Sequence, residues 1–264
     1  MPIHVLKAET IELSDRPDVR YTLPGFHVLG GGAALDYVNQ PHPGCLLTTM
    51  APILVRDIPY GWQAAGKAHQ VSGPTSISMW SYLLSDPGDE FEVVAFVSPE
   101  SARSLAPQAT AEVGPGFTLT GGGAVSLGRE HLLTMSRPVT NSNTNRRWRV
   151  ASKAHFIPEL ASIQAIAIGI KDRSGRPIAG RTTPGTSGRG GGYLTAVSAD
   201  LPDGFVLTGG GAVDLWEGLG RLLVASKPTD FNPRSWTAVS KDHSEPALGT
   251  LFAFARGIRL PPPR

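Results

Sequence analysis

The sequence predicts an all-β fold with three-fold internal symmetry, in which three antiparallel sheets surround one axis. Three observations lead to this prediction. A nine-residue glycine-rich motif occurs three times at nearly constant spacing, and the same order of apolar and polar segments follows each copy. The chain also holds 31 glycines and 23 prolines among 264 residues, with only 17% charged side chains. Such a composition is typical of short strands joined by many turns.

The glycine-rich motif fixes the register of the three copies. It reads GFHVLGGGA at 25–33, GFTLTGGGA at 116–124 and GFVLTGGGA at 204–212. The alternating apolar residues before the glycines predict one buried strand face. The glycines themselves predict a bulge with positive φ or the close approach of another backbone. A phosphate-binding loop is excluded, because a strand-like AVSL or AVDL follows where a helix would have to begin.

The repeat extends well beyond the glycines and divides the chain into copies at 1–90, 91–178 and 179–264, which we interpret as one domain. Tryptophan and Lys-x-His recur with steps of 86 and 88 residues. The recurring segments are Leu-Leu-Thr or Leu-Leu-Val at 46–48, 132–134 and 222–224, a proline at 52, 138 and 228, a tryptophan at 62, 148 and 236, and alternating apolar runs at 77–84, 163–170 and 251–258.

Taken in order, the first copy is expected to open with strands at 9–13 and 19–23 around a turn at 14–18. An extra strand is predicted at Phe91–Val97. Residues 172–192 are rich in Gly, Pro, Ser and Thr without a hydrophobic period, which predicts a loop. Each copy then offers about four strands, so the predicted architecture is a β-prism-like barrel with one sheet per copy. A propeller is excluded, since three units of this length match neither its blade number nor its blade size.

Composition also limits the partners. The formal net charge is +2, from 24 basic and 22 acidic residues, so no nucleic acid partner is expected. No apolar run is long enough for a signal peptide or a transmembrane segment. We therefore expect a protein that is cytoplasmic at synthesis, with non-classical export left open. The single cysteine, Cys45, is interpreted as a small semi-buried thiol rather than a nucleophile.

The succession G-F-x-L-T-G-G-G-A, L-L-x-x-S-x-P and W-x-A-x-S-K-D-H is best kept in residues 204–243. It resembles a repeat of poorly characterised bacterial proteins of the secreted or surface type. The three-fold organisation is similar to β-prism lectins and to β-prism modules that target toxins to glycans. This resemblance covers nearly the whole chain and implies a lectin-like, carbohydrate-binding role, without a sugar-site motif that matches residue by residue.

Residues near the end of each copy are the candidates for ligand binding. On a strand, side chains two apart face the same side, so each Lys-x-His forms a local cationic pair. Lysine and histidine donors beside an exposed tryptophan would suit a glycan or another hydroxyl-rich ligand. The same recurrence is also what core and strand-end residues would show. The candidates are Trp62, Lys67, His69, Trp148, Lys153, His155, Trp236, Lys241, Asp242 and His243.

Two more specific roles, a metal site and a catalytic triad, can be considered for the same residues. The three histidines could converge on the axis as a three-nitrogen metal site, although no carboxylate recurs to orient the rings. Ser240, Asp242 and His243 could be imagined as a triad, but neighbours on one strand cannot align nucleophile, base and orienter. No cofactor or metal is expected. The sequence predicts a non-enzymatic, glycan-binding module with up to three related sites. There are two alternatives. One is an enzyme with one divergent site, and the other is a toxin-targeting or structural component that binds a protein surface.

Overall fold

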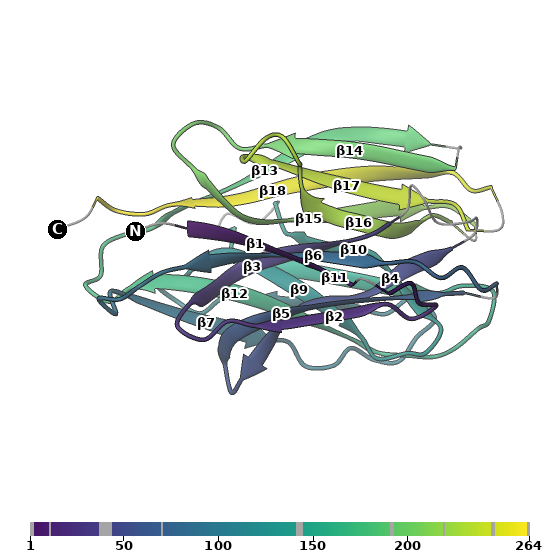
Figure 1. Cartoon of the computed structure of the whole chain (residues 1–264), viewed down its shortest axis with the longest axis horizontal. Coiled ribbons are helices and arrows are strands. Elements are labelled where there is room, and N and C mark those ends of the chain that lie inside the picture. The colour runs from purple at the N-terminus through teal and green to yellow at the C-terminus, as the bar shows by residue number, and fades with distance from the viewer. Residues whose placement is uncertain are drawn as a thin grey trace.

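The computed structural model describes residues 3–10, 12–36, 44–69, 71–140, 145–190, 193–218, 220–243 and 246–262. These residues form eighteen strands and no helix, arranged in three six-stranded antiparallel sheets (Figure 1). The prediction of an all-β fold with three sheets is therefore confirmed. Within the described residues, a search for long apolar helices of the kind that cross a membrane finds none.

The three sheets are named here by their strand order, and each consists of six neighbouring strands. Sheet I contains β1 (Ile3–Glu9), β6 (Ile77–Leu84), β3 (His27–Leu35), β16 (Leu222–Pro228), β17 (Ser235–Lys241) and β14 (Leu194–Asp200). Sheet II contains β2 (Asp18–Thr22), β5 (Ile58–Ala68), β4 (Cys45–Val55), β9 (Thr118–Ser126), β12 (Ile163–Asp172) and β7 (Phe91–Val97). Sheet III contains β13 (Ala179–Gly190), β18 (Gly249–Arg259), β15 (Val206–Trp216), β10 (His131–Pro138), β11 (Arg147–Ala154) and β8 (Gln108–Glu112).

Each sheet combines strands from two copies, so the expectation of one sheet per copy is wrong. Every copy contributes its first, third and sixth strands to one sheet and its second, fourth and fifth strands to the next. The copies meet at three seams, where β3 pairs with β16, β9 with β4 and β15 with β10. The repeat pattern could not reveal this exchange, because periodicity identifies equivalent strands without saying which copy each one pairs with.

The three sheets stay open, so the molecule is a prism rather than a closed barrel. Every sheet ends in two edge strands, and the first two strands of each copy lie at the edges of different sheets. Figure 1 places both chain termini at the same end of the molecule. The strand directions put the Lys-x-His segments, which begin in the last residues of β5, β11 and β17, at the opposite end.

Edge strands account for the other differences from the sequence prediction. Six strands per copy are present instead of four, and the first strand ends at Glu9 rather than beginning there. The expected loop at 172–192 contains the strand β13, which pairs with β18 and has a register shift after Pro184. Glycine and proline are tolerated at an edge because one side of the strand needs no hydrogen-bonded neighbour. The strand predicted at Phe91–Val97 and the three alternating runs are confirmed.

The first glycine of each triplet lies where the three copies meet. Cα atoms of Gly121 and Gly30 lie 3.5 and 3.9 Å from the place that a Cβ on Gly209 would occupy. At Gly121, an added Cβ would lie only 2.8 Å from the Gly30 Cα. Hydroxyl groups link the strands there, since Thr120 Oγ1 donates to the Leu29 carbonyl at 2.6 Å and Thr208 Oγ1 donates to the Thr120 carbonyl at 2.7 Å. Close approach of backbones therefore requires glycine at Gly30 and Gly121, whereas a Cβ at Gly209 would make ordinary contacts.

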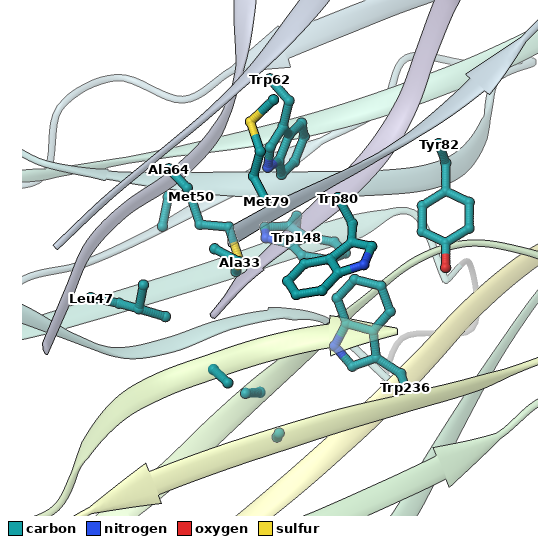
Figure 2. Close-up of a cluster of buried hydrophobic side chains, with 14 of the residues drawn as sticks. Ala33, Leu47, Met50, Trp62, Ala64, Met79, Trp80, Tyr82, Trp148 and Trp236 are labelled. Atoms are coloured by element: carbon teal, nitrogen blue, oxygen red, sulfur yellow. The ribbon is translucent and has the colours of Figure 1, made fainter. Parts of the chain in front are cut away.

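The second glycine of each triplet makes room for the tryptophan of its own copy. A Cβ added at Gly31 would lie 2.6 Å from the Trp62 ring, and Gly122 and Gly210 are covered in the same way by Trp148 and Trp236. All three tryptophans are 0% exposed. Figure 2 shows them inside one cluster of buried side chains. Glycine and indole thus form one interlocking unit that occurs three times.

We expect Gly122→Ala to destabilise the protein by about 1–3 kcal/mol or more, because the added methyl group would overlap the Trp148 ring and force it out of its position. Gly88→Ala is the matched control, since the nearest atoms to its added Cβ are 3.5 Å away on the Glu90 side chain. Urea unfolding of both variants measures the difference. Equal free energies of unfolding for the two variants would contradict this role of the glycine.

Candidate functional site

The three histidines of the Lys-x-His pairs meet on the pseudo-three-fold axis. Their ring centroids are 5.2 Å apart for His69 and His155, 5.4 Å for His69 and His243, and 5.0 Å for His155 and His243. All three side chains are buried, and Phe156 packs edge-on against His155 at 4.2 Å. The sequence had suggested that these rings could converge, and the structure brings them together as an aromatic cluster.

The environment of this cluster favours neutral imidazoles. Burial lowers the pKa of His155 to about 3, with further contributions from Lys153 and His69. Burial, followed by the charge of Lys67, also lowers the pKa of His69. No group of three or more His, Cys, Asp or Glu side chains within the described ranges is arranged to hold a metal ion. The described geometry thus gives the metal alternative no support.

Each lysine of the Lys-x-His pairs reaches from its own copy to the next one. Lys67 Nζ lies 2.9 Å from Glu130 Oε2, which also lies 3.1 Å from His69 Nδ1. Lys153 Nζ lies 4.1 Å from the centroid of the Trp216 ring, and burial lowers its pKa to about 8. The three lysines therefore help to join neighbouring copies.

Lys241 makes the third such junction and faces a different chemical group. It is 0% exposed, and burial lowers its pKa to about 8. Its interaction partners include Cys45, whose own pKa is raised to about 12, mainly by burial. The Cys45 thiol donates to the Gly73 carbonyl at 3.3 Å. Cys45 is thus a protonated, buried thiol, as the sequence indicated, and it lacks the thiolate character that a nucleophile needs.

Asp242, the acidic residue special to the third copy, belongs to a buried ion network. Arg221 is 0% exposed, and its guanidinium lies 3.1 Å from Asp242 Oδ1 and 3.6 Å from Asp214 Oδ2. The same guanidinium donates to the Ser240 carbonyl at 3.0 Å. Ser240 and Asp242 are therefore both engaged with Arg221, an arrangement that joins strands and does not form a triad.

The ligand contact predicted for the three tryptophans would require an exposed ring face. Trp62, Trp148 and Trp236 have none, because the core encloses them completely. Their indole nitrogens point inward as well: Trp148 Nε1 donates to Ser136 Oγ at 3.0 Å and Trp236 Nε1 donates to Ser226 Oγ at 2.9 Å. In this structure the recurring Trp, Lys and His residues serve the packing of the three copies.

A groove on the outer face of sheet I is a further candidate site, and the sequence did not predict it. Its volume is about 570 Å³. Two lysines flank an indole there, with Lys7 Nζ 5.7 Å and Lys227 Nζ 5.4 Å from the Trp80 ring centroid. The residues that line it are Lys7, Glu9, Thr10, Ala34, Leu35, Asp36, Ser76, Ser78, Trp80, Lys227 and Asp230.

Small side chains at the seam between β3 and β16 keep this groove open. Ala34 faces Ala225 across the seam, and Ser78 lies beside Ala34 on β6. The equivalent positions of sheet III carry Val213, Met135 and Phe252, which pack with Phe254 into an outer apolar cluster. In sheet II the equivalent positions carry Val125, Thr49 and Gln164, and Val125 packs against a small outer cluster that includes Ile166. Only small residues line the seam of sheet I, which leaves the space that side chains fill in the other two.

Ion pairs order the rim of the groove. Lys7 pairs with Glu9 at 2.8 Å, and Lys227 pairs with Asp230 at 2.7 Å. Hydrogen bonding from Lys7 lowers the pKa of Glu9, which also accepts a hydrogen bond from Ser78 at 3.2 Å. The rim therefore offers carboxylate acceptors, ammonium donors and hydroxyl groups around one aromatic ring. A comparison of the three copies position by position would have revealed the small residues, but not that they lie beside a groove.

No protein-family model matches the chain, and no curated protein matches it. The functional proposal consequently depends on the geometry of the groove and on the resemblance noted in the sequence.

We expect stability to fall as the pH drops from about 6.5 towards 3, because the pKa of His155 is about 3 in the folded protein and about 6.5 in the unfolded chain. The unfolded chain binds this proton more tightly, so the stabilisation is complete above pH 6.5 and is lost on acidification. Urea unfolding between pH 7 and 4 measures the slope.

His155→Gln should make that slope shallower, whereas His4→Gln, which changes an exposed histidine on β1, should leave it as in the unmodified protein. Identical slopes for His155→Gln and the unmodified chain would show that the buried cluster does not carry the pH dependence.

Proposed function

We propose that this protein is a non-enzymatic carbohydrate-binding module whose ligand occupies the groove on sheet I. The observation that carries the proposal is the open seam beside Trp80, where an indole ring lies among hydroxyl, carboxylate and ammonium groups. Ligand sites of this kind combine an apolar surface with a few convergent polar groups. Trp80 is 8% exposed because the two lysines lie over its ring, so the apolar face of a sugar ring can pack on the indole once Lys7 moves aside, while its hydroxyl groups bond to the rim.

The balance of charge in the groove supports a hydroxyl-rich ligand over a strongly charged one. Two lysines and three carboxylates line it, and the two lysines pair with two of those carboxylates. A sugar ring uses both donors and acceptors, so a rim of both kinds fits it. Lys7 covers the Trp80 ring but its side chain is 53% exposed, so it can move aside when a ligand enters.

The proposal differs from the sequence prediction in the number of sites. Apolar side chains fill the equivalent seam of sheet III, and the larger residues Val125, Thr49 and Gln164 stand at that of sheet II, so a single groove is proposed instead of three. An enzyme with one divergent site is the alternative, and turnover of the bound ligand would distinguish it from a binding module. A toxin-targeting or structural role on a protein surface remains the third class, and it would leave the groove without a small-molecule ligand.

We expect Ala34→Val combined with Ser78→Phe to abolish ligand binding, because these changes fill the groove with the residue types found at the seam of sheet III. Trp80→Ala should weaken binding at least about tenfold, as truncation of a central aromatic contact does. A glycan array identifies a ligand, and titration calorimetry measures affinity, with an expected stoichiometry of one.

Phe254→Ala is the matched control, since Phe254 occupies the position of Trp80 on sheet III and should leave affinity unchanged. Thermal unfolding of each variant separates lost binding from lost folding. Full binding by the filled-groove variant, or turnover of the ligand, would refute the proposal.

A further inference from the structure

A second pocket lies on sheet II where copies 1 and 2 meet, near the histidine end of the molecule. Its volume is about 220 Å³. Three cationic side chains line it together with two hydroxyl groups, whereas Asp18 is its one acidic residue. The lining residues are Arg16, Pro17, Asp18, Thr48, Ala65, Gly66, Lys67, Ser126, Gly128 and Arg129.

Several hydrogen-bond donors of the cationic side chains in this pocket have no partner within the described residues. The guanidinium groups of Arg16 and Arg129 have no hydrogen-bond or ion-pair partner among the described residues. Lys67 uses two of its three donors, on the Arg129 carbonyl and on Glu130. The acidic residue, Asp18, is already held by Arg20 through contacts of 3.0 and 3.2 Å. Positive charge in the pocket thus exceeds what the chain neutralises.

A buried hydroxyl group gives an independent indication of a ligand. Ser126 Oγ lines this pocket, is shielded from solvent, and has no hydrogen-bond partner. Nearly all buried polar groups in proteins are hydrogen-bonded, so an unpartnered hydroxyl requires an explanation. A bound group that accepts hydrogen bonds would satisfy this hydroxyl and the nearby guanidinium groups together.

The residues that form this pocket are not part of the three-fold repeat. At the positions equivalent to Arg16, the other copies have Ala106 and Leu194, and Ser126 corresponds to Leu35 and Asp214. Both other seams fold without the arginine and without the hydroxyl. These residues are therefore specific to one seam and are not part of the repeated packing.

We propose that this pocket binds a tetrahedral oxyanion, phosphate or sulfate, either free or as a group on a larger molecule. Arg16 and Arg129 donate charge-assisted hydrogen bonds to its oxygens, Lys67 supplies its remaining donor, and Ser126 donates from the buried side. The site is independent of the carbohydrate groove, because it lies on another sheet and shares no residue with it.

The test is a titration of the whole protein with sodium phosphate and with sodium sulfate at low ionic strength, followed by the amide NMR signals of Gly66 and Gly128. Saturable shifts at millimolar anion are expected. Arg16→Gln and Arg129→Gln should each weaken binding about tenfold or more, as the loss of a hydrogen bond to a charged group does. Ser126→Ala should weaken it with unchanged thermal stability.

Arg149→Gln changes an exposed arginine on sheet III and should have no effect on the titration. Absence of saturable shifts with both anions, or equal weakening by Arg149→Gln and Arg16→Gln, would overturn the proposal. A sulfated or phosphorylated saccharide that binds more tightly than the inorganic ion identifies the group as part of a larger ligand, and equal affinity identifies the free ion. The filled-groove variant should bind the anion normally, so failure of one site is distinguishable from failure of the other.

Discussion

The fold depends on the contact between three backbones at the pseudo-three-fold axis. Gly30, Gly121 and Gly209 lie there within a few ångströms of each other, and a side chain at Gly30 or Gly121 would overlap the backbone of the neighbouring strand, β15 or β3. The following glycines admit the three tryptophans, so the axis and the core are set by the same short motif. Close packing of this kind tolerates little change in volume, which explains why one motif recurs almost unchanged in every copy.

Around this axis, each sheet contains strands from two copies. The side chains that meet between neighbouring copies therefore differ from one seam to the next. Since every sheet takes strands from two copies, the lysine at the end of each fifth strand meets a residue of the next copy. Lys67 meets Glu130 and Lys153 meets Trp216, while Lys241 interacts electrostatically with Cys45. The repeated residues serve the fold, and the proposed binding sites lie where the copies depart from their symmetry.

The sequence was sufficient to predict the fold class, because glycine triplets and alternating apolar runs specify strands that must be buried together. It predicted the strands at Phe91–Val97 and Ile77–Leu84 correctly. It failed at β13, where an edge position permits glycine and proline, and at the pairing between copies, which periodicity does not encode. It placed the ligand contacts on recurring residues such as Trp148, which the structure buries, whereas the groove proposed beside Trp80 depends on small side chains at a seam between copies that the sequence does not specify.

The most direct test of the shared-sheet architecture is native-state hydrogen exchange on Trp148→Ala, a change in the second copy alone. Loss of a buried indole should cost about 3–5 kcal/mol. If every sheet is shared, the slowest-exchanging amides of β3, β9 and β15 should lose protection by the same free energy, because the three copies unfold as one cooperative unit. Loss of protection confined to β7–β12, with β3 and β15 unchanged, would contradict the shared architecture and show that each copy folds by itself.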